Sequence, residues 1–169
     1  MKNRRIRKLR EKNMSTVIKF KPTDKELLAL AFDIRRKVFI EEQKVSEEEE
    51  FEFEEDCVHF LVYHKKVAYG TARYRETERG MKLERFALLK EGRGKGLGYD
   101  LLRYVLTDAR QFRKPIFLNA QVSVVDFYKQ QGFVVDGPKF IEANIEHYPM
   151  SFENPHNLHK AIEKAVCRR

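Results

Sequence analysis

Four glycines spaced two residues apart separate a predicted strand from a predicted helix near the middle of the chain. They are Gly92, Gly94, Gly96 and Gly98. An apolar run at residues 81–89 precedes them, and an amphipathic pattern begins near Leu97. Glycines let a ligand approach the main chain, and the first amides of a helix attract anions. With Arg93 and Lys95 in the same turn, this glycine loop (residues 92–98) predicts a cradle for a phosphate or diphosphate.

The spacing of the glycine loop argues against two common phosphate sites. A Walker A loop places a Lys and then a Ser or Thr after its last glycines, whereas Lys95 is followed by Gly96. A Rossmann fingerprint has a glycine at its sixth place, and counting from Gly94 that place holds Tyr99. Nucleotide kinases and dinucleotide-binding enzymes are therefore disfavoured.

Several separated segments resemble one family. Residues 93–98, an arginine, two residues, a glycine, one residue and a glycine, closely resemble the pyrophosphate loop of the GNAT acyl-CoA N-acyltransferases. Residues 127–133, FYKQQGF, are similar to a segment near the end of the GNAT core. The segments similar to the small bacterial ElaA-like branch are residues 35–43, 56–59 and 146–150. The resemblance covers residues 15–150 and implies an N-acyltransferase enzyme.

The fold class that follows is α/β (α+β). The resemblance implies the GNAT fold, a mixed, mostly antiparallel sheet of about six or seven strands flanked by helices. Apolar alternation predicts strands at residues 15–21, 58–63, 67–75, 81–89, 116–120, 133–135 and 145–152. A strand, the glycine loop, a helix and a strand in succession form a central βαβ crossover, so the strands at 81–89 and 116–120 should be parallel.

Helical spacing of apolar residues predicts three helices inside the region of resemblance. The first covers residues 27–38 after a cap at Thr23 or Asp24, and the second carries an apolar stripe from Leu97 to Phe112. Ser123 is expected to cap a third helix that runs through Gln131, with a glycine at its end.

Composition favours one domain with short additions. The 169 residues, 42% of them hydrophobic, suffice for one core. We expect a basic, flexible tail at residues 1–13, a GNAT domain at 14–150 and an appended C-terminal helix at 151–169. Cys57 and Cys167 form no disulfide framework, and no signal or membrane-spanning run is evident. The expected location is the cytoplasm, and a homodimer is left open.

The net charge of +8 is strongly segregated along the chain. Residues 1–13 hold seven Lys or Arg against one Glu, whereas the acidic segment, residues 41–56, holds ten acids against one Lys. We expect the acidic segment to be a solvated loop; lining the site, it would favour a cationic acceptor such as a polyamine or lysine. The basic tail is short and has no interleaved aromatics, so nucleic acid is not expected as a partner.

The resemblance implies acetyl transfer from acetyl-CoA to a primary amine by direct attack in a ternary complex. The pantetheine arm would pair with the main chain of Phe86, Ala87 and Leu88. The pyrophosphate would contact Arg93, Gly94, Lys95, Gly96, Leu97 and Gly98. Tyr128 stands at the place of the usual general acid, next to the cofactor sulfur. Gln121 stands where many relatives have an Asn that bonds pantetheine, so that contact is expected to be altered or lost.

The general base is poorly marked in the sequence. Glu84, His59 and His147 are candidates, since a carboxylate or imidazole accepts the amine proton directly or through water. Glu84 is also readily explained as a surface strand residue paired with Arg85. No metal is expected, because the His and acidic residues show no ligand spacing.

Three functions stay open at this point. The first is an N-acetyltransferase acting on a small-molecule or protein amine. The second is a domain that binds acyl-CoA without turnover, as a sensor or scaffold. The third is a nucleic-acid-associated protein that uses the basic tail.

Overall fold

The computed structural model of the chain describes residues 15–153, and within them eight strands form one sheet. The strands are β1 (Ser15–Phe20), β2 (Val58–His64), β3 (Val67–Thr77), β4 (Gly80–Leu88), β5 (Ile116–Gln121), β6 (Phe133–Val135), β7 (Phe140–Glu142) and β8 (Ile145–Phe152). Their order is β1-β2-β3-β4-β5-β8-β6, and β7 also pairs with β8. Seven strands were expected; β7 is the additional one.

Helices and helical turns connect these strands. The α-helices are α2 (Lys25–Arg35), α3 (Glu47–Glu50), α4 (Leu97–Arg110) and α5 (Val125–Lys129). The other helical segments are η1 (Arg36–Glu42), η2 (Glu54–Asp56), η3 (Lys90–Gly92) and η4 (Val122–Val124). The predicted first helix therefore continues, but η1 is a π-helix. Such irregular turns occur often at functional sites.

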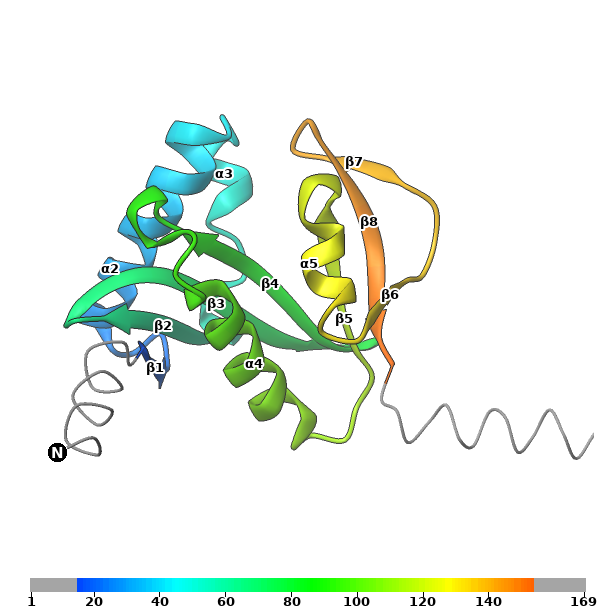
Figure 1. Cartoon of the computed structure of the whole chain (residues 1–169), viewed down its shortest axis with the longest axis horizontal. Coiled ribbons are helices and arrows are strands. Elements are labelled where there is room, and N and C mark those ends of the chain that lie inside the picture. The colour runs from blue at the N-terminus through cyan, green and yellow to red at the C-terminus, as the bar shows by residue number, and fades with distance from the viewer. Residues whose placement is uncertain (1–14, 154–169) are drawn as a thin grey trace, which may run out of the picture.

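The expected βαβ crossover is confirmed. α4 connects β4 to β5, and these are parallel, while the other neighbouring strands of the sheet are antiparallel. The strand pairing of β4 with β5 is confined to two residue pairs, Met81 with Ile116 and Lys82 with Phe117. Figure 1 shows the sheet opening beyond these pairs, with β1 to β4 on one side and β5, β8 and β6 on the other.

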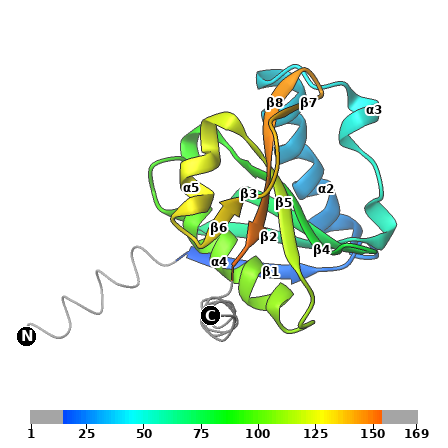
Figure 2. The same cartoon turned by 90° about the vertical axis from the view of Figure 1, so that its right-hand side faces the viewer.

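α2 and α4 lie on opposite faces of β1 to β4 (Figure 2), and each packs on the sheet through its own apolar cluster. Successive strand residues point to opposite faces, so Phe60 packs with the α4 cluster, whereas its neighbour Leu61 packs with the α2 and η1 cluster. The buried stripe of α4 is Leu97, Leu101, Leu102, Val105, Leu106 and Ala109. The prediction extended this stripe too far, because α4 ends at Arg110 and Phe112 is 45% exposed.

Of the two predicted N-terminal helix caps, the structure confirms one. The carboxylate of Asp24 accepts a hydrogen bond from the amide of Leu27 at 3.3 Å, as expected for the cap of α2. The prediction for Ser123 is wrong, because the chain forms the 3-10 turn η4 there and α5 starts only at Val125, with no side-chain cap.

The acidic segment is not a purely solvated loop, which corrects the prediction. Glu50 is 2% exposed, and its carboxylate pairs with the equally buried guanidinium of Arg35. Nη2 of Arg35 also donates to Glu54 at 2.7 Å, and Nη1 of Arg73 reaches the same carboxylate at 2.6 Å. The ion pairs of Arg35 and Arg73 therefore hold the acidic segment against α2 and β3.

The predicted basic tail and C-terminal helix lie outside the described residues, apart from residues 151–153, which end β8 and follow it. Between residues 15 and 153, none of the helices has the length and apolar character needed to cross a membrane.

Candidate active site

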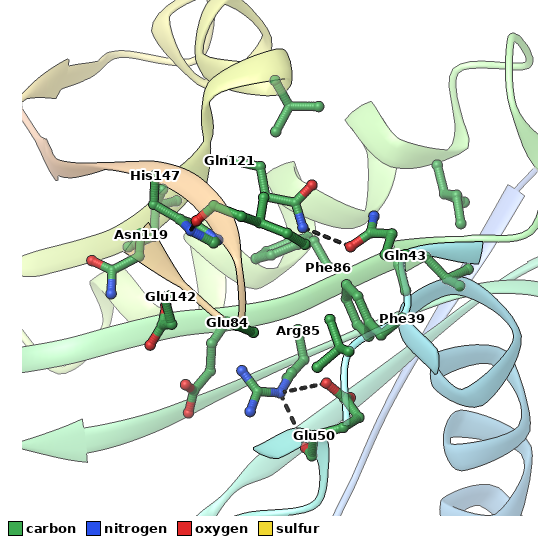
Figure 3. A pocket seen from close by; sticks show the side chains of 18 of the residues that line it. Phe39, Gln43, Glu50, Glu84, Arg85, Phe86, Asn119, Gln121, Glu142 and His147 are labelled. Carbon is green, nitrogen blue, oxygen red and sulfur yellow. Dashed lines mark hydrogen bonds and ion pairs between the residues drawn. The ribbon is translucent and has the colours of Figure 1, made fainter. Parts of the chain in front are cut away.

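The opening between β4 and β5 contains a cavity of about 770 Å³. β4 and β5 form its walls, η1 and the acidic segment close one side, and residues from β7 and β8 close another (Figure 3). This volume is in the range of ordinary small-molecule sites. The cavity exists because β4 and β5 share only their first two residue pairs.

A bulge in β4 turns its edge towards the cavity. Residues 85–86 lie opposite a single residue of β3, and Arg85 has a φ of 60°. Bulges commonly lie next to active sites, where they redirect a strand. The three residues predicted to pair with pantetheine, Phe86, Ala87 and Leu88, line the cavity at and after this bulge.

The four glycines of the glycine loop serve two different purposes. Gly94 and Gly96 have φ of 72° and 76°, where other residues are strained, and a Cβ on either would meet no atom within 4 Å. At Gly92 and Gly98 a Cβ would come 2.7 and 2.9 Å from neighbouring side chains. Of the four, therefore, only Gly94 and Gly96 leave open space beside the main chain, and they lie directly before α4 begins at Leu97.

Arg93 and Lys95 already have partners within the protein. Nε and Nη2 of Arg93 donate to the carbonyl of Leu88 at 3.1 and 2.9 Å, and Nη2 lies 2.9 Å from Glu42 of η1. Nζ of Lys95 lies 5.2 Å from the ring centroid of Tyr69. Arg93 thus holds a carbonyl that pantetheine was predicted to use.

Gln121, at the end of β5, reaches across the cavity. Its Nε2 donates a hydrogen bond to Oε1 of Gln43, the residue after η1, at 2.7 Å. Both side chains line the cavity (Figure 3). The resemblance compared Gln121 with the shorter Asn of many relatives, and the longer side chain permits this contact.

Tyr128, the predicted general acid, lies on α5 and lines the cavity. Its ring makes edge contacts with Phe86 at 6.1 Å and Phe133 at 5.9 Å between centroids. Burial raises the pKa of the Tyr128 hydroxyl above its ordinary value, because an apolar environment disfavours the phenolate. The hydroxyl therefore stays protonated at neutral pH.

Glu84, the predicted general base, lines the cavity from β4 among positive charges. Its carboxylate accepts a hydrogen bond from Arg75 at 2.7 Å and lies 3.4 Å from both Arg73 and Lys82. Burial alone would raise the pKa of Glu84, but these neighbours hold it below its ordinary value. The carboxylate is consequently ionised at neutral pH and is a weaker base than an isolated one.

Arg85 does not pair with Glu84. The alternative explanation of Glu84, as a surface strand residue paired with Arg85, is therefore wrong. Arg85 turns instead to Glu50, with Nε 3.1 Å from the carboxylate (Figure 3). Glu49, Glu50 and Glu52 of the acidic segment line the cavity. The segment thus forms one wall of the site.

The two candidate histidines occupy different environments. His59 stacks on Phe20, lies beside Glu54 and is not part of the cavity lining. Burial lowers the pKa of His59. His147 lines the cavity from β8 and is 8% exposed, and its Nδ1 lies 2.8 Å from the carbonyl of Ile145. The structure therefore brings His147, but not His59, together with Tyr128 and Glu84.

Comparison with known proteins identifies the family. The acetyltransferase (GNAT) domain profile matches residues 21–154. The Bacillus subtilis (strain 168) protein YyaT is 36% identical over 137 residues, 76% of this chain and 90% of YyaT. This chain belongs to the GNAT acetyltransferase family. It is an acyltransferase, and acyl-CoA is the donor class that the family uses.

Solved structures share this GNAT fold. An acyl-CoA N-acyltransferase from Pseudomonas aeruginosa has a TM-score of 0.73 and 25% identity, and covers 83% of this chain and 100% of its own. Escherichia coli ElaA has a TM-score of 0.73 at 22% identity, with the same coverage. The fold class and the resemblance predicted from the sequence are confirmed.

Several residues of this GNAT cavity were missed by the sequence analysis. They are Phe39, Gln43, Asn119 and Glu142. Phe39 and Gln43 belong to or follow η1, and a π-helix has no recognised sequence pattern; Glu142 ends the unexpected β7. Within residues 15–153 no group of three or more His, Cys, Asp and Glu side chains is arranged to hold a metal ion.

Proposed function

We propose that this protein transfers an acetyl group from acetyl-CoA to a primary amine by direct attack in a ternary complex. The observation that carries the proposal is the continuous cavity between β4 and β5. It runs past the bulged main chain of β4 and includes Arg93 and Gly98 of the glycine loop, Tyr128, and a wall of acidic residues. Donor and acceptor can therefore meet in the middle of the site.

The glycine loop is proposed to bind the pyrophosphate of the cofactor. Gly94 and Gly96 leave room beside the main chain, and the first amides of α4 point towards the same place. Arg93 is 45% exposed at its side chain, so it can leave Glu42 and the Leu88 carbonyl for a phosphate. Lys95 and Leu97 complete the proposed contacts.

The pantetheine arm is proposed to lie along Phe86, Ala87 and Leu88, with Gln121 on the opposite wall. Gln121 keeps its side-chain oxygen for the arm while its amide group donates to Gln43. The contact between residue 121 and pantetheine, expected to be altered or lost, is therefore proposed to persist. The longer side chain of Gln121 would make it while Gln43 holds that side chain in place.

Tyr128 is proposed to donate its proton to the thiolate that leaves CoA. Its hydroxyl is protonated at neutral pH because burial raises its pKa. Glu84 stays the sequence-derived candidate for the base, although three cations weaken it as a proton acceptor. Its negative charge, with that of Glu49 and Glu52, favours a cationic amine, from a small molecule or a protein.

A thiol-release assay with acetyl-CoA and a broad panel of amines tests the proposal. Turnover with at least one amine, and N-acetylated product by mass spectrometry, is the expected result. Calorimetric binding of acetyl-CoA without release on any amine would identify a non-catalytic sensor or scaffold instead. Binding to RNA or DNA that weakens steeply with salt and needs residues 1–13 would favour the nucleic-acid alternative.

A further inference from the structure

We infer that His147 is the catalytic base that removes the proton from the attacking amine. The inference rests on the acetyl transfer proposed above and goes further by naming the proton acceptor. Three observations carry it: the side chain lines the cavity, more than nine-tenths of the residue is buried, and only one of its ring nitrogens has a partner among residues 15–153.

The partner of Nδ1 defines the tautomer of His147. The carbonyl of Ile145, 2.8 Å away, can only accept a hydrogen bond, so Nδ1 must carry the proton and donate it. In a neutral imidazole the other nitrogen, Nε2, then has a free lone pair. Stacking on Phe140, with ring centroids 5.7 Å apart, holds the ring in its plane. The side chain thus presents a single acceptor in a fixed direction.

The fold places this acceptor on the face of the sheet that lines the cavity. His147 of β8 lies opposite Gln121 of β5 in the strand register, so both side chains are on the cavity face of the sheet. Figure 3 shows the His147 ring projecting from β8 into the cavity, with Asn119 and Glu142 beside it. Because Nε2 is not among the sealed, unpartnered polar atoms of residues 15–153, an amine in the cavity can reach it and donate an N–H to it.

Comparison with Glu84 favours His147 as the base. The carboxylate of Glu84 is surrounded by Arg73, Arg75 and Lys82, which stabilise its ionised form and weaken its affinity for a proton. The Nε2 atom of His147, by contrast, has no hydrogen-bond partner in the described part of the chain. An imidazole is also the side chain that most often serves as a general base in enzymes.

The proposed step balances in atoms and charge. The lone pair of the neutral amine forms the new C–N bond as the thioester C–S bond breaks. The nitrogen loses one proton to Nε2 of His147, and the Tyr128 hydroxyl gives one proton to the departing thiolate. The imidazolium then returns a proton to the phenolate through water. The products are the N-acetylated amine and the free CoA thiol.

Chemical rescue tests this role, because a merely structural histidine does not respond to a free base. With the amine found in the panel, His147→Ala should lower kcat by about a hundredfold or more while the Kd of acetyl-CoA stays within about twofold. Added imidazole should restore at least about tenfold of the loss. His64→Ala, the same change at a half-buried residue outside the cavity lining, should show neither effect.

His147→Gln provides a second variant in case His147→Ala does not fold. A glutamine can keep the hydrogen bond to Ile145 but offers no basic nitrogen, so a comparable loss of kcat is expected. Transfer within about twofold of wild type in either variant would overturn the inference and leave the acetyl transfer standing. A loss in folded protein that imidazole does not relieve would also overturn it. An inactive wild-type protein would remove both proposals.

Discussion

Nε2 of Gln121 donates a hydrogen bond to Oε1 of Gln43 across 2.7 Å, and this contact joins the end of β5 to η1 over the cavity. The bond uses one N–H of Gln121 and leaves its oxygen available. β4 and β5 separate here, so this hydrogen bond spans the opening, as does the ring contact of Phe86 with Tyr128. Gln43 therefore orients the side chain that is proposed to hold the pantetheine arm.

The first prediction concerns this pair. Gln43→Ala should raise the KM for acetyl-CoA by about three- to tenfold, since one partly buried neutral hydrogen bond is worth about 1 kcal/mol. The turnover number should change less, because Gln43 is not proposed to contact the reacting atoms. Steady-state kinetics with varied acetyl-CoA measure both. Gln111→Ala, the same change at an exposed residue, is the control, and equal KM values would contradict the proposed role.

The second prediction compares two neighbouring arginines. Arg35 is 1% exposed and pairs with Glu50, whereas Arg36 is exposed and pairs with Glu47 at 2.6 Å. Arg35→Met leaves the Glu50 carboxylate buried without its main partner and should lower the free energy of unfolding by about 3–5 kcal/mol. Arg36→Met should lower it by about 1 kcal/mol or less. Urea unfolding measures both changes.

The loss in Arg35→Met should depend on pH. Burial raises the pKa of Glu50 above its ordinary value even with Arg35 present, and removal of Arg35 raises it further. A carboxyl group whose pKa is higher in the folded than in the unfolded state destabilises the fold as pH rises above the unfolded value. The difference from wild type should therefore be smaller at pH 5 than at pH 8, and the opposite order would contradict this origin.

Sequence patterns predicted the helices and strands well where residues close together in the chain determine them. The apolar spacing of α4 and the glycines before it are patterns among residues close together in the chain. The βαβ crossover could therefore be predicted from them. The end of α4 could not, because Phe112 fits the helical spacing yet lies in the turn after it. Ser123 is a good cap by residue type, but the chain there forms η4 instead.

The site was predictable only where a motif fixes a position. Arg93 and Gly98 of the glycine loop line one cavity with Tyr128, and the motifs had marked all three, whereas the rest of residues 93–98 are not among the lining residues. The partners of charged residues were not predictable, since Arg35 and Glu50 are fifteen positions apart and meet only in the folded chain. For the same reason the sequence could not rank Glu84 against His147.

The third prediction concerns Glu42, which competes with the cofactor for Arg93. The Glu42 carboxylate lies 2.9 Å from Nη2 of Arg93, whose side chain is about half exposed. Glu42→Gln removes that competing charge and should tighten acetyl-CoA binding by about two- to fivefold, as an exposed ion pair is worth about 0.2–1 kcal/mol. Calorimetry measures the Kd. Glu41→Gln, at the neighbouring exposed acid, is the control, and weaker binding in Glu42→Gln would show that Glu42 instead prepares Arg93 for the phosphate.

The fourth prediction separates proton donation by Tyr128 from packing. Tyr128→Phe keeps the ring that contacts Phe86 and Phe133 and removes only the hydroxyl. Turnover should fall by about a hundred- to ten-thousandfold, while the Kd of acetyl-CoA stays within about twofold. Tyr104→Phe, on the exposed side of α4, should have no effect. Because burial raises the pKa of Tyr128, wild-type turnover should not decline between pH 7 and about pH 9 through loss of this proton. Near-normal turnover in Tyr128→Phe would mean that water, and not this hydroxyl, protonates the leaving thiolate.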